Sequence, residues 1–331
     1  MVHPLEGLRS LRSICSAPGK VILFGEHAVV YGHPAIAAAT DQRTYVEVDC
    51  CGSRTTVNGF RIHERYHSYL LKAVEKVWHR EDHVRLQTEG GVPSASGTGS
   101  SAALTVAAVG ALHRLQQMED PARLAQDAFT VERATQGGGS PTDTTTSAAG
   151  GGIAIAGKPP GIGEPLWDLS WEESTWHVER VDLPKMSLVV GNSGVKGRTD
   201  AQVSKVAHAM KKNPIVRDAL SEMGQIARDA APALEAKDLE TVGRLMDRAH
   251  GCMHTIGVNH EAVQRLIDAV KGTPGTFGAK ITGAGGGGSM ICLTDKPARA
   301  AAAIEEAGGT PYPVTLGGPG VQWHETMPKH P

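Results

Sequence analysis

Aromatic residues and long apolar runs are scarce in this sequence. Phe, Trp and Tyr make up 4% of the 331 residues, whereas the hydrophobic set as a whole makes up 40%. A buried core therefore has to be built mainly from Ala, Val, Leu and Ile. No stretch approaches 18 apolar residues, and the N-terminus has no apolar segment of the signal-peptide kind. We therefore expect neither a membrane partner nor a secretory leader.

Paired cysteines and an excess of basic charge are also missing. Of five cysteines, Cys50 and Cys51 are neighbours, which is a poor geometry for a disulfide, and no Cys-x-x-Cys pair occurs. A reducing, cytoplasmic location is predicted from this pattern. The net charge is −2, and Lys211 and Lys212 form the only adjacent basic pair. We therefore expect no nucleic-acid partner.

Glycine, in contrast, is abundant, and one glycine-rich stretch opens into an apolar segment. It reads Pro-Ser-Ala-Ser-Gly-Thr-Gly-Ser-Ser-Ala-Ala over residues 93–103. Gly97 and Gly99 permit a tight curl, and a helix beginning here has free amides at the positive end of its dipole. This combination favours a phosphate site. A Gly/Ser linker before a helix fits the same residues, because the lysine of the Walker pattern is missing.

Two further stretches decide between these interpretations. Residues 17–32 read APGKVILFGEHAVVYG, and residues 280–289 read KITGAGGGGS. Together with Gly97-Thr98-Gly99-Ser100-Ser101-Ala102 they resemble the three ordered motifs of the GHMP small-molecule kinases. The first motif is most similar to that of the mevalonate kinases. The resemblance runs from about Ala17 to Leu293 and so covers most of the chain.

This resemblance implies an α+β protein with the GHMP kinase fold. A ribosomal protein S5 domain 2-like N-terminal domain is expected over residues 1–185, and a ferredoxin-like C-terminal domain over residues 186–331. The implied activity is ATP-dependent phosphorylation of (R)-mevalonate to 5-phosphomevalonate, in isoprenoid biosynthesis. Phosphomevalonate kinase and mevalonate 3-kinase are the alternative enzymes. The alternative that is not an enzyme is a sensor or regulator with the same fold but without catalytic activity. ATP, Mg²⁺ and a homodimeric state are expected of the family.

The resemblance also carries over individual residues. Lys20 and Asp143 match the catalytic pair, where the aspartate either removes the proton of the substrate hydroxyl or only orients it. Ser101 and Glu132 match the magnesium ligands, with Ser100 as an alternative to Ser101. The nucleotide is expected on Pro93, Ser94, Ala95, Ser96, Gly97, Thr98, Gly99, Ser100, Ser101 and Ala102. The mevalonate site is expected to comprise Lys20, Glu26, His27, Asp143, Thr199, Gly283 and Ala284.

Periodicity predicts the elements that carry these residues. Strands are expected at 21–24, 35–39, 44–48, 84–88, 153–156, 187–191, 290–293 and 311–316. Helices are expected at 66–78, 102–115, 122–135, 201–210, 215–230, 239–252, 263–271 and 296–306. Asp143 is expected in a Gly/Ser/Thr loop. The interleaving of helices and strands favours an α+β arrangement over a doubly wound sheet.

Three other patterns have competing interpretations. The glycines at 283–288 match G-x-G-x-x-G, but a strand-like segment follows where a dinucleotide site needs a helix. His250 and His254 are spaced as zinc ligands on a helix, yet lack further Cys or Asp/Glu nearby. The tryptophans of residues 167–176 suit either a partner-binding surface or the packing of a hairpin, and the hairpin is the interpretation we favour.

Overall fold

A large, mostly antiparallel sheet forms the centre of the first half of the chain. The computed structural model describes residues 12–92 and 97–328. The strand order is β4-β3-β5-β2-β6-β8-β7, and β1 pairs with β2 and β13. The strands are β1 (Arg12–Phe24), β2 (Ala35–Gly52), β3 (Thr56–Val57), β4 (Phe60–Arg61), β5 (His83–Gly90), β6 (Gly152–Ala156), β7 (Glu164–Trp171), β8 (Ser174–Val181) and β13 (Gln322–His324).

The two long strands β1 and β2 are buried on both faces. Ile22 and Ala37 point into one apolar cluster, whereas Val21 and Ala38 point into another. Side chains that alternate along a strand face opposite sides of its sheet, so each strand contributes to two cores. Burial on both sides explains why these segments read as continuous apolar runs. The prediction of separate strands at 35–39 and 44–48 is wrong, because a single strand covers both.

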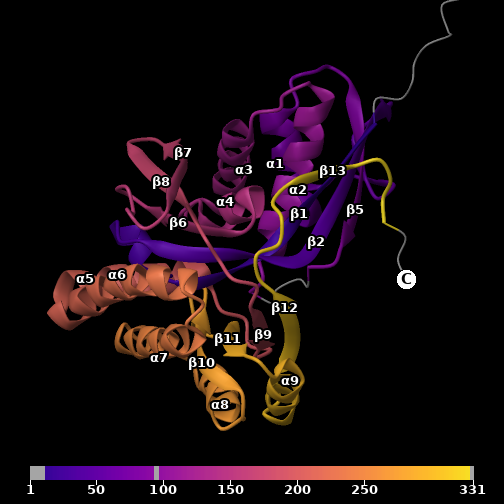
Figure 1. The fold of residues 1–331 in the computed structure, drawn as a ribbon. Coiled ribbons are helices and arrows are strands. Elements are labelled where there is room, and N and C mark those ends of the chain that lie inside the picture. The colour runs from indigo at the N-terminus through magenta and orange to yellow at the C-terminus, as the bar shows by residue number, and fades with distance from the viewer. Residues whose placement is uncertain (1–11, 93–96, 329–331) are drawn as a thin grey trace, which may run out of the picture.

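Helices cover the two faces of this sheet. One group comprises α1 (Glu64–Val77), α2 (Ser100–Leu115), α3 (Pro121–Gln136) and α4 (Thr142–Ala149), and it lies together beside β1, β2 and β5 (Figure 1). A short 3-10 helix, η1 (Ala28–Tyr31), follows β1. Helix α2 is buried on nearly every side because its residues are mostly Ala, Val and Leu. On the opposite face, α6 (Pro214–Glu235) and α7 (Leu239–Thr255) pack on the other core of β1 and β2.

The second half of the chain forms a smaller antiparallel sheet. Its order is β10-β11-β9-β12, with β9 (Ser187–Asn192), β10 (Thr276–Thr282), β11 (Ser289–Thr294) and β12 (Thr310–Thr315). The remaining helices are α5 (Thr199–Lys212), α8 (Glu261–Lys271) and α9 (Pro297–Glu306). Helices α5 to α8 lie between β9 and β10, and α9 lies between β11 and β12. This is the β-α-β-β-α-β order of a ferredoxin-like domain, which the family resemblance implied. The strand β10 itself was not expected from the sequence pattern.

Two of the competing interpretations are settled by the elements themselves. The tryptophan segment forms the β7–β8 hairpin, and Trp171 and Trp176 meet Phe129 of α3 edge-on, so it packs against the first helical layer. The glycines at 283–288 join β10 to β11 directly, which rules out the strand–helix crossover of a dinucleotide site.

The last described strand returns to the first sheet. β13 pairs antiparallel with β1, with Ile14 opposite His324. The division at residues 185 and 186 therefore stays a prediction, and β13 lies apart from the sheet of the second half. Within residues 12–92 and 97–328, no helix is long and apolar enough to span a bilayer.

Candidate active site

Lys20 is a buried cation near the end of β1. The pairing of β1 with β2 shifts register between Pro18 and Lys20, and such bulges turn a side chain away from the regular pleat. The backbone amide of Lys20 donates a hydrogen bond to the carbonyl of Thr98 at 2.8 Å, which joins the strand to the glycine-rich loop. The Lys20 side chain is only 6% exposed. A lysine buried this far needs an opposite charge beside it.

Asp143 supplies that charge. Its Oδ2 lies 2.9 Å from Nζ of Lys20, so the two predicted catalytic residues form an ion pair. The Asp143 side chain is 33% exposed, in contrast to its partner. One side of the carboxylate is therefore engaged by the lysine, while the rest stays accessible to a ligand.

The prediction of a loop around Asp143 is wrong, because the residue lies in the first turn of helix α4. A run of Thr and Ser has low helix propensity, so no local pattern indicated this helix. Tertiary contacts hold it instead. Thr142 and residues 144–147 are buried, and the hydroxyl of Ser147 donates to the carbonyl of Pro18 at 2.8 Å. An aspartate in a first turn is also favoured by the helix dipole.

Glu132 of α3 is a buried carboxylate beside this pair. Its Oε2 accepts from the Thr144 hydroxyl at 3.3 Å, and its Oε1 accepts from the Gln136 amide at 3.4 Å. Burial and the nearby negative charge of Asp143 raise the pKa of Glu132 to about 8, although Lys20 acts in the opposite direction. Both hydrogen bonds are long, so each oxygen keeps room for a stronger ligand.

Ser101 lies in the first turn of α2, one residue after the helix begins at Ser100. Tyr69 of α1 lies near both Ser101 and Glu132. Its hydroxyl accepts from the Gln136 amide at 2.9 Å, and the same amide donates to Glu132. Burial raises the pKa of Tyr69, and interactions with Gln136 and Ser101 act against that shift. The choice of Ser101 over Ser100 as a magnesium ligand stays a prediction.

These residues suit a magnesium ion. Mg²⁺ takes oxygen ligands, keeps several waters, and needs only one or two protein oxygens. Glu132 and Ser101 offer such a sparse set, and the elevated pKa of Glu132 indicates that its negative charge lacks full compensation in the metal-free protein. In the described part of the chain, no group of three or more His, Cys, Asp and Glu side chains is arranged to hold a metal ion.

The glycine loop closes around the Lys20 side chain. Gly99 has a φ of +76°, and a Cβ atom there would lie 2.7 Å from Cγ of Lys20. Only glycine combines this left-handed backbone with so close an approach. Ala102 follows in the first turn of α2, where the amides have no partner within the helix. Pro93, Ser94, Ala95 and Ser96, predicted for the same nucleotide site, lie outside the described residues.

The third motif meets both of the others. A Cβ at Gly97 would lie 3.1 Å from the side chain of Ser289, at the start of β11. On the other side, Nε2 of His27 donates to the carbonyl of Ala284 at 2.9 Å. His27 is buried, and burial lowers its pKa, so the ring is neutral near pH 7. The structure thus brings together segments that are more than 250 residues apart in the sequence.

Glu26 is buried as well, and one of its carboxylate oxygens is already engaged. Lys280 of β10 donates to Oε1. The other oxygen, Oε2, has no hydrogen-bond partner among the described residues. Glu26 was predicted to contact mevalonate, and Oε2 is its carboxylate oxygen without a partner among the described residues.

Thr199 and Gly283 are the remaining predicted substrate residues. Thr199 is the exposed first residue of α5, and no hydrogen bond or ion pair connects it to Lys20 or Asp143 within residues 12–92 and 97–328. The preceding segment does contact the third motif, because the Gly288 amide donates to the carbonyl of Val195 at 2.7 Å. Gly283 is half-buried directly after β10. The roles of both residues stay predictions.

Sequence reasoning missed several side chains that support the site. Lys280 opened the third motif without an assigned role, and Tyr69, Gln136 and Ser147 were not singled out. A lysine at an inward position of an apolar strand could have indicated Lys280, but no strand was expected at 276–282. Contacts between residues so far apart in the chain, such as Ser147 with Pro18, leave no local pattern.

The zinc interpretation of the α7 histidines finds no support in the contacts. Nε2 of His250 bonds to Gln264 at 3.0 Å, and Nδ1 of His254 lies 3.3 Å from the amide nitrogen of Asn259. Each ring has its own amide partner. No set of converging metal ligands includes them in the described ranges.

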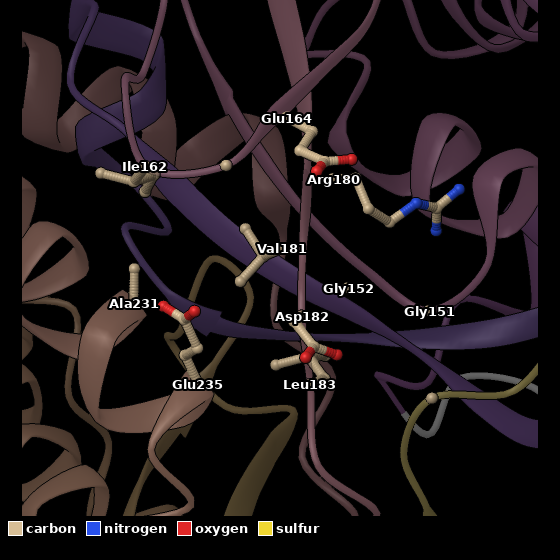
Figure 2. Close-up of a pocket in the computed structure, with 12 residues that line it drawn as sticks. Gly151, Gly152, Ile162, Glu164, Arg180, Val181, Asp182, Leu183, Ala231 and Glu235 are labelled. Atoms are coloured by element: carbon tan, nitrogen blue, oxygen red, sulfur yellow. The ribbon is translucent and has the colours of Figure 1, made fainter.

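A separate cavity lies between the two halves of the chain. Its volume is about 540 Å³, and its lining includes Glu164, Arg180, Asp182 and Glu235 (Figure 2). Arg180 also donates to the carbonyl of Ala149, the last residue of α4. Among the residues that the structure describes, none of the predicted catalytic, nucleotide or substrate residues lines this cavity.

Comparison with known proteins agrees with the convergence of the three motifs. The family model described as the GHMP kinases N terminal domain matches residues 66–151, and the model described as GHMP kinases C terminal matches residues 230–313. The mevalonate kinase of Thermococcus onnurineus is 34% identical, over 96% of this chain and 100% of its own length. That of Pyrococcus furiosus is 32% identical with the same coverage. This chain belongs to the mevalonate kinase family of the GHMP kinases.

Solved structures of the family share its fold. The mevalonate kinase of L. major, in complex with R-mevalonate, has a TM-score of 0.76 at 23% identity and covers 92% of this chain and 95% of its own. The Methanococcus jannaschii mevalonate kinase has a TM-score of 0.73 at 24% identity, covering 92% and 98%. The predicted GHMP kinase fold is confirmed.

Proposed function

We propose that this protein transfers the γ-phosphoryl group of ATP to the 5-hydroxyl of (R)-mevalonate, giving 5-phosphomevalonate and ADP. The observation that carries the proposal is the Lys20–Asp143 ion pair, 2.9 Å long, at the meeting point of three family motifs. The near-full-length curated relatives from Thermococcus and Pyrococcus, which are mevalonate kinases, support the choice of substrate.

The two charges have complementary roles in the transfer. The accessible side of Asp143 orients the substrate hydroxyl and accepts its proton as the oxygen bonds to the γ-phosphorus. The bond from that phosphorus to the β–γ bridging oxygen breaks, and ADP leaves. Lys20 stabilises the charge that develops on the attacking oxygen and on the transferred group. Phosphoryl transfer depends mainly on such positioning and electrostatic stabilisation.

The loop at 97–99 and the start of α2 are proposed to hold the phosphates of ATP. The first-turn amides of α2 and the positive end of its dipole are suited to anions. Glu132 and Ser101 are the residues that would hold Mg²⁺. When bound, the ion neutralises charge on the β- and γ-phosphates.

The substrate is proposed to lie between the first and third motifs. His27 bonds there to the backbone of Ala284, and Glu26, whose Oε2 has no partner among the described residues, directly precedes it in the chain. A neutral imidazole and a carboxylate oxygen are groups that bind hydroxyls. Thr199 and Gly283 are proposed at the rim of this pocket.

The sister enzymes are less favoured. A phosphomevalonate kinase of Streptococcus pneumoniae has a TM-score of 0.74 but only 16% identity, and a Lactococcus lactis galactokinase has 18% identity. These neighbours show the shared fold alone. A dead sensor is disfavoured by the intact pairing of Lys20 with Asp143 and the burial of Glu132 beside it.

The proposal is tested by ADP release from the purified protein with Mg-ATP and one of four alcohols: mevalonate, phosphomevalonate, galactose or homoserine. We expect turnover with mevalonate well above the other three, and a product one phosphoryl group heavier than mevalonate. Equal or faster turnover of phosphomevalonate or galactose would overturn it.

Sedimentation of the same sample tests the predicted homodimer. A reducing, cytoplasmic location is supported by the free thiols of Cys15, Cys252 and Cys292.

A further inference from the structure

Lys280 is a fully enclosed lysine in the second half of the chain. It lies on β10, and its side chain is 0% exposed. Burial lowers its pKa, and the carboxylate of Glu26 acts against that shift. Removing an ammonium group from water is unfavourable, so such a residue persists only where a specific contact compensates for it.

That contact joins the two halves of the protein at the turn that follows β1. Lys280 Nζ donates to Oε1 of Glu26, whose side chain is 1% exposed, and also to the carbonyl of Ile281 at 2.6 Å. Glu26 lies in the short turn between β1, which carries Lys20, and η1, which His27 directly precedes. The ion pair therefore fixes the turn that follows the strand carrying the proposed catalytic lysine.

Two further contacts also link the third motif to the first. The hydroxyl of Thr282 donates to the carbonyl of Ile22 at 3.1 Å, and the carbonyl of Ala284 accepts from His27 at 2.9 Å. Residues 280 and 282 alternate on β10, so their side chains face the same side of the strand. Of residues 280, 282 and 284, Lys280 alone brings a charge to the first motif.

The turn itself leaves little room to adjust. Gly25 has a φ of +87°, and a Cβ there would lie 2.4 Å from the carbonyl oxygen of Pro34. The turn is thus confined by Pro34 on one side and by Lys280 on the other. Loss of the cation would leave the Glu26 carboxylate buried and unpaired, which favours its movement toward solvent.

We propose that Lys280 is a positioning residue for mevalonate: its ion pair with Glu26 holds the 25–28 turn so that Oε2 of Glu26 and the ring of His27 face the substrate. The proposal rests on the proposed function. Through Lys280, the third motif would contribute to alcohol binding. Its glycines cannot supply this role, because the role depends on a charged side chain.

The test compares Lys280→Met with Lys271→Met in the full-length protein. Met keeps the length of the side chain without its charge. Lys271 is the matched control, since it is ion-paired to Asp247 at 3.1 Å in the same half of the chain but is 39% exposed. The readouts are the KM of mevalonate, the KM of ATP, and amide hydrogen exchange over residues 25–32 without substrates.

We expect Lys280→Met to raise the KM of mevalonate about tenfold or more, the scale of a lost hydrogen bond to a charged group. The KM of ATP should stay within about twofold, and amides of the 25–32 segment should exchange faster. Lys271→Met should change none of the three. If Lys280→Met lowers thermal stability while the KM of mevalonate and the exchange of this segment stay at parent values, the proposal is overturned.

A second variant covers a failure of Lys280→Met to fold. Glu26→Gln/Lys280→Met removes both buried charges, so it is expected to fold, and its 25–32 amides should still exchange faster than those of the parent. Parent-like exchange in the double variant would contradict the proposal.

If the parent protein turns over no mevalonate, the proposed function fails, and the exchange measurements still decide whether Lys280 holds the turn.

Discussion

Replacing Glu132 with Gln should stabilise the metal-free protein at alkaline pH while impairing its use of magnesium. The carboxylate is buried, next to Asp143, and these two effects raise its pKa from 4.5 to about 8. Between those values the folded protein binds more protons than the unfolded chain, so stability falls as pH rises through this window. The amide of the Glu132→Gln variant does not titrate, so the variant lacks this loss.

The size of the effect follows from the shift. One pKa unit corresponds to about 1.4 kcal/mol, so Glu132 should destabilise the folded state by about 1 kcal/mol at pH 5 and about 4 kcal/mol at pH 8. Substitution by Gln should thus gain about 3 kcal/mol more at pH 8 than at pH 5. In kinetics, the same variant should need more Mg²⁺ and turn over more slowly, because one charged oxygen ligand is lost.

The assay is urea unfolding in EDTA at pH 5 and pH 8 for the parent and Glu132→Gln. Glu75→Gln is the control, since Glu75 is an exposed carboxylate on α1 paired with Lys72. A stability difference between parent and Glu132→Gln that is the same at both pH values would refute the reasoning about the buried charge. A magnesium titration that overlays that of the parent would show that Glu132 is not a ligand.

Two further substitutions test how the site is built. Gly99→Ala should reduce turnover on the order of 10²-fold, because the added Cβ displaces the Lys20 side chain. Gly137→Ala is the control, since Gly137 has a similar φ of +77° but no atom lies within 4 Å of an added Cβ, and its turnover should stay near that of the parent. Parent-like turnover of Gly99→Ala would show that Lys20 tolerates displacement. Ser147→Ala should destabilise the protein by about 1–3 kcal/mol in urea unfolding, since the Pro18 carbonyl loses its buried donor, and an unchanged midpoint would show that this contact does not anchor α4.

Local patterns were sufficient for much of the fold. Alternation and apolar runs located β5, β6 and β9, and helical periodicity located α3 and α6 to within a few residues. The ferredoxin-like order of the second half was implied by the family resemblance, but local patterns missed the strand β10. The three motifs identified the family, and they predicted the pairing of Lys20 with Asp143.

The features that sequence reasoning missed depend on contacts between distant segments. Helix α4 is made of residues that disfavour helices, and buried hydrogen bonds such as that of Ser147 hold it in place. The β13 strand is only three residues long and forms because β1 offers it an edge to pair with. The ion pair of Lys280 with Glu26 joins opposite ends of the chain, so neither residue's neighbours indicate the other.

The measurement that tests the central claim most directly is single-turnover kinetics on Asp143→Asn, Lys20→Met and the double variant, with ATP affinity measured separately. Asp143→Asn should lower turnover by about 10²- to 10⁴-fold, the range of proton transfer by a positioned side chain. Since both residues act on one hydroxyl, the double variant should be little worse than the poorer single variant, with ATP affinity little changed. Fully additive losses, or near-parent turnover of Asp143→Asn, would contradict the assignment of the chemistry to this pair.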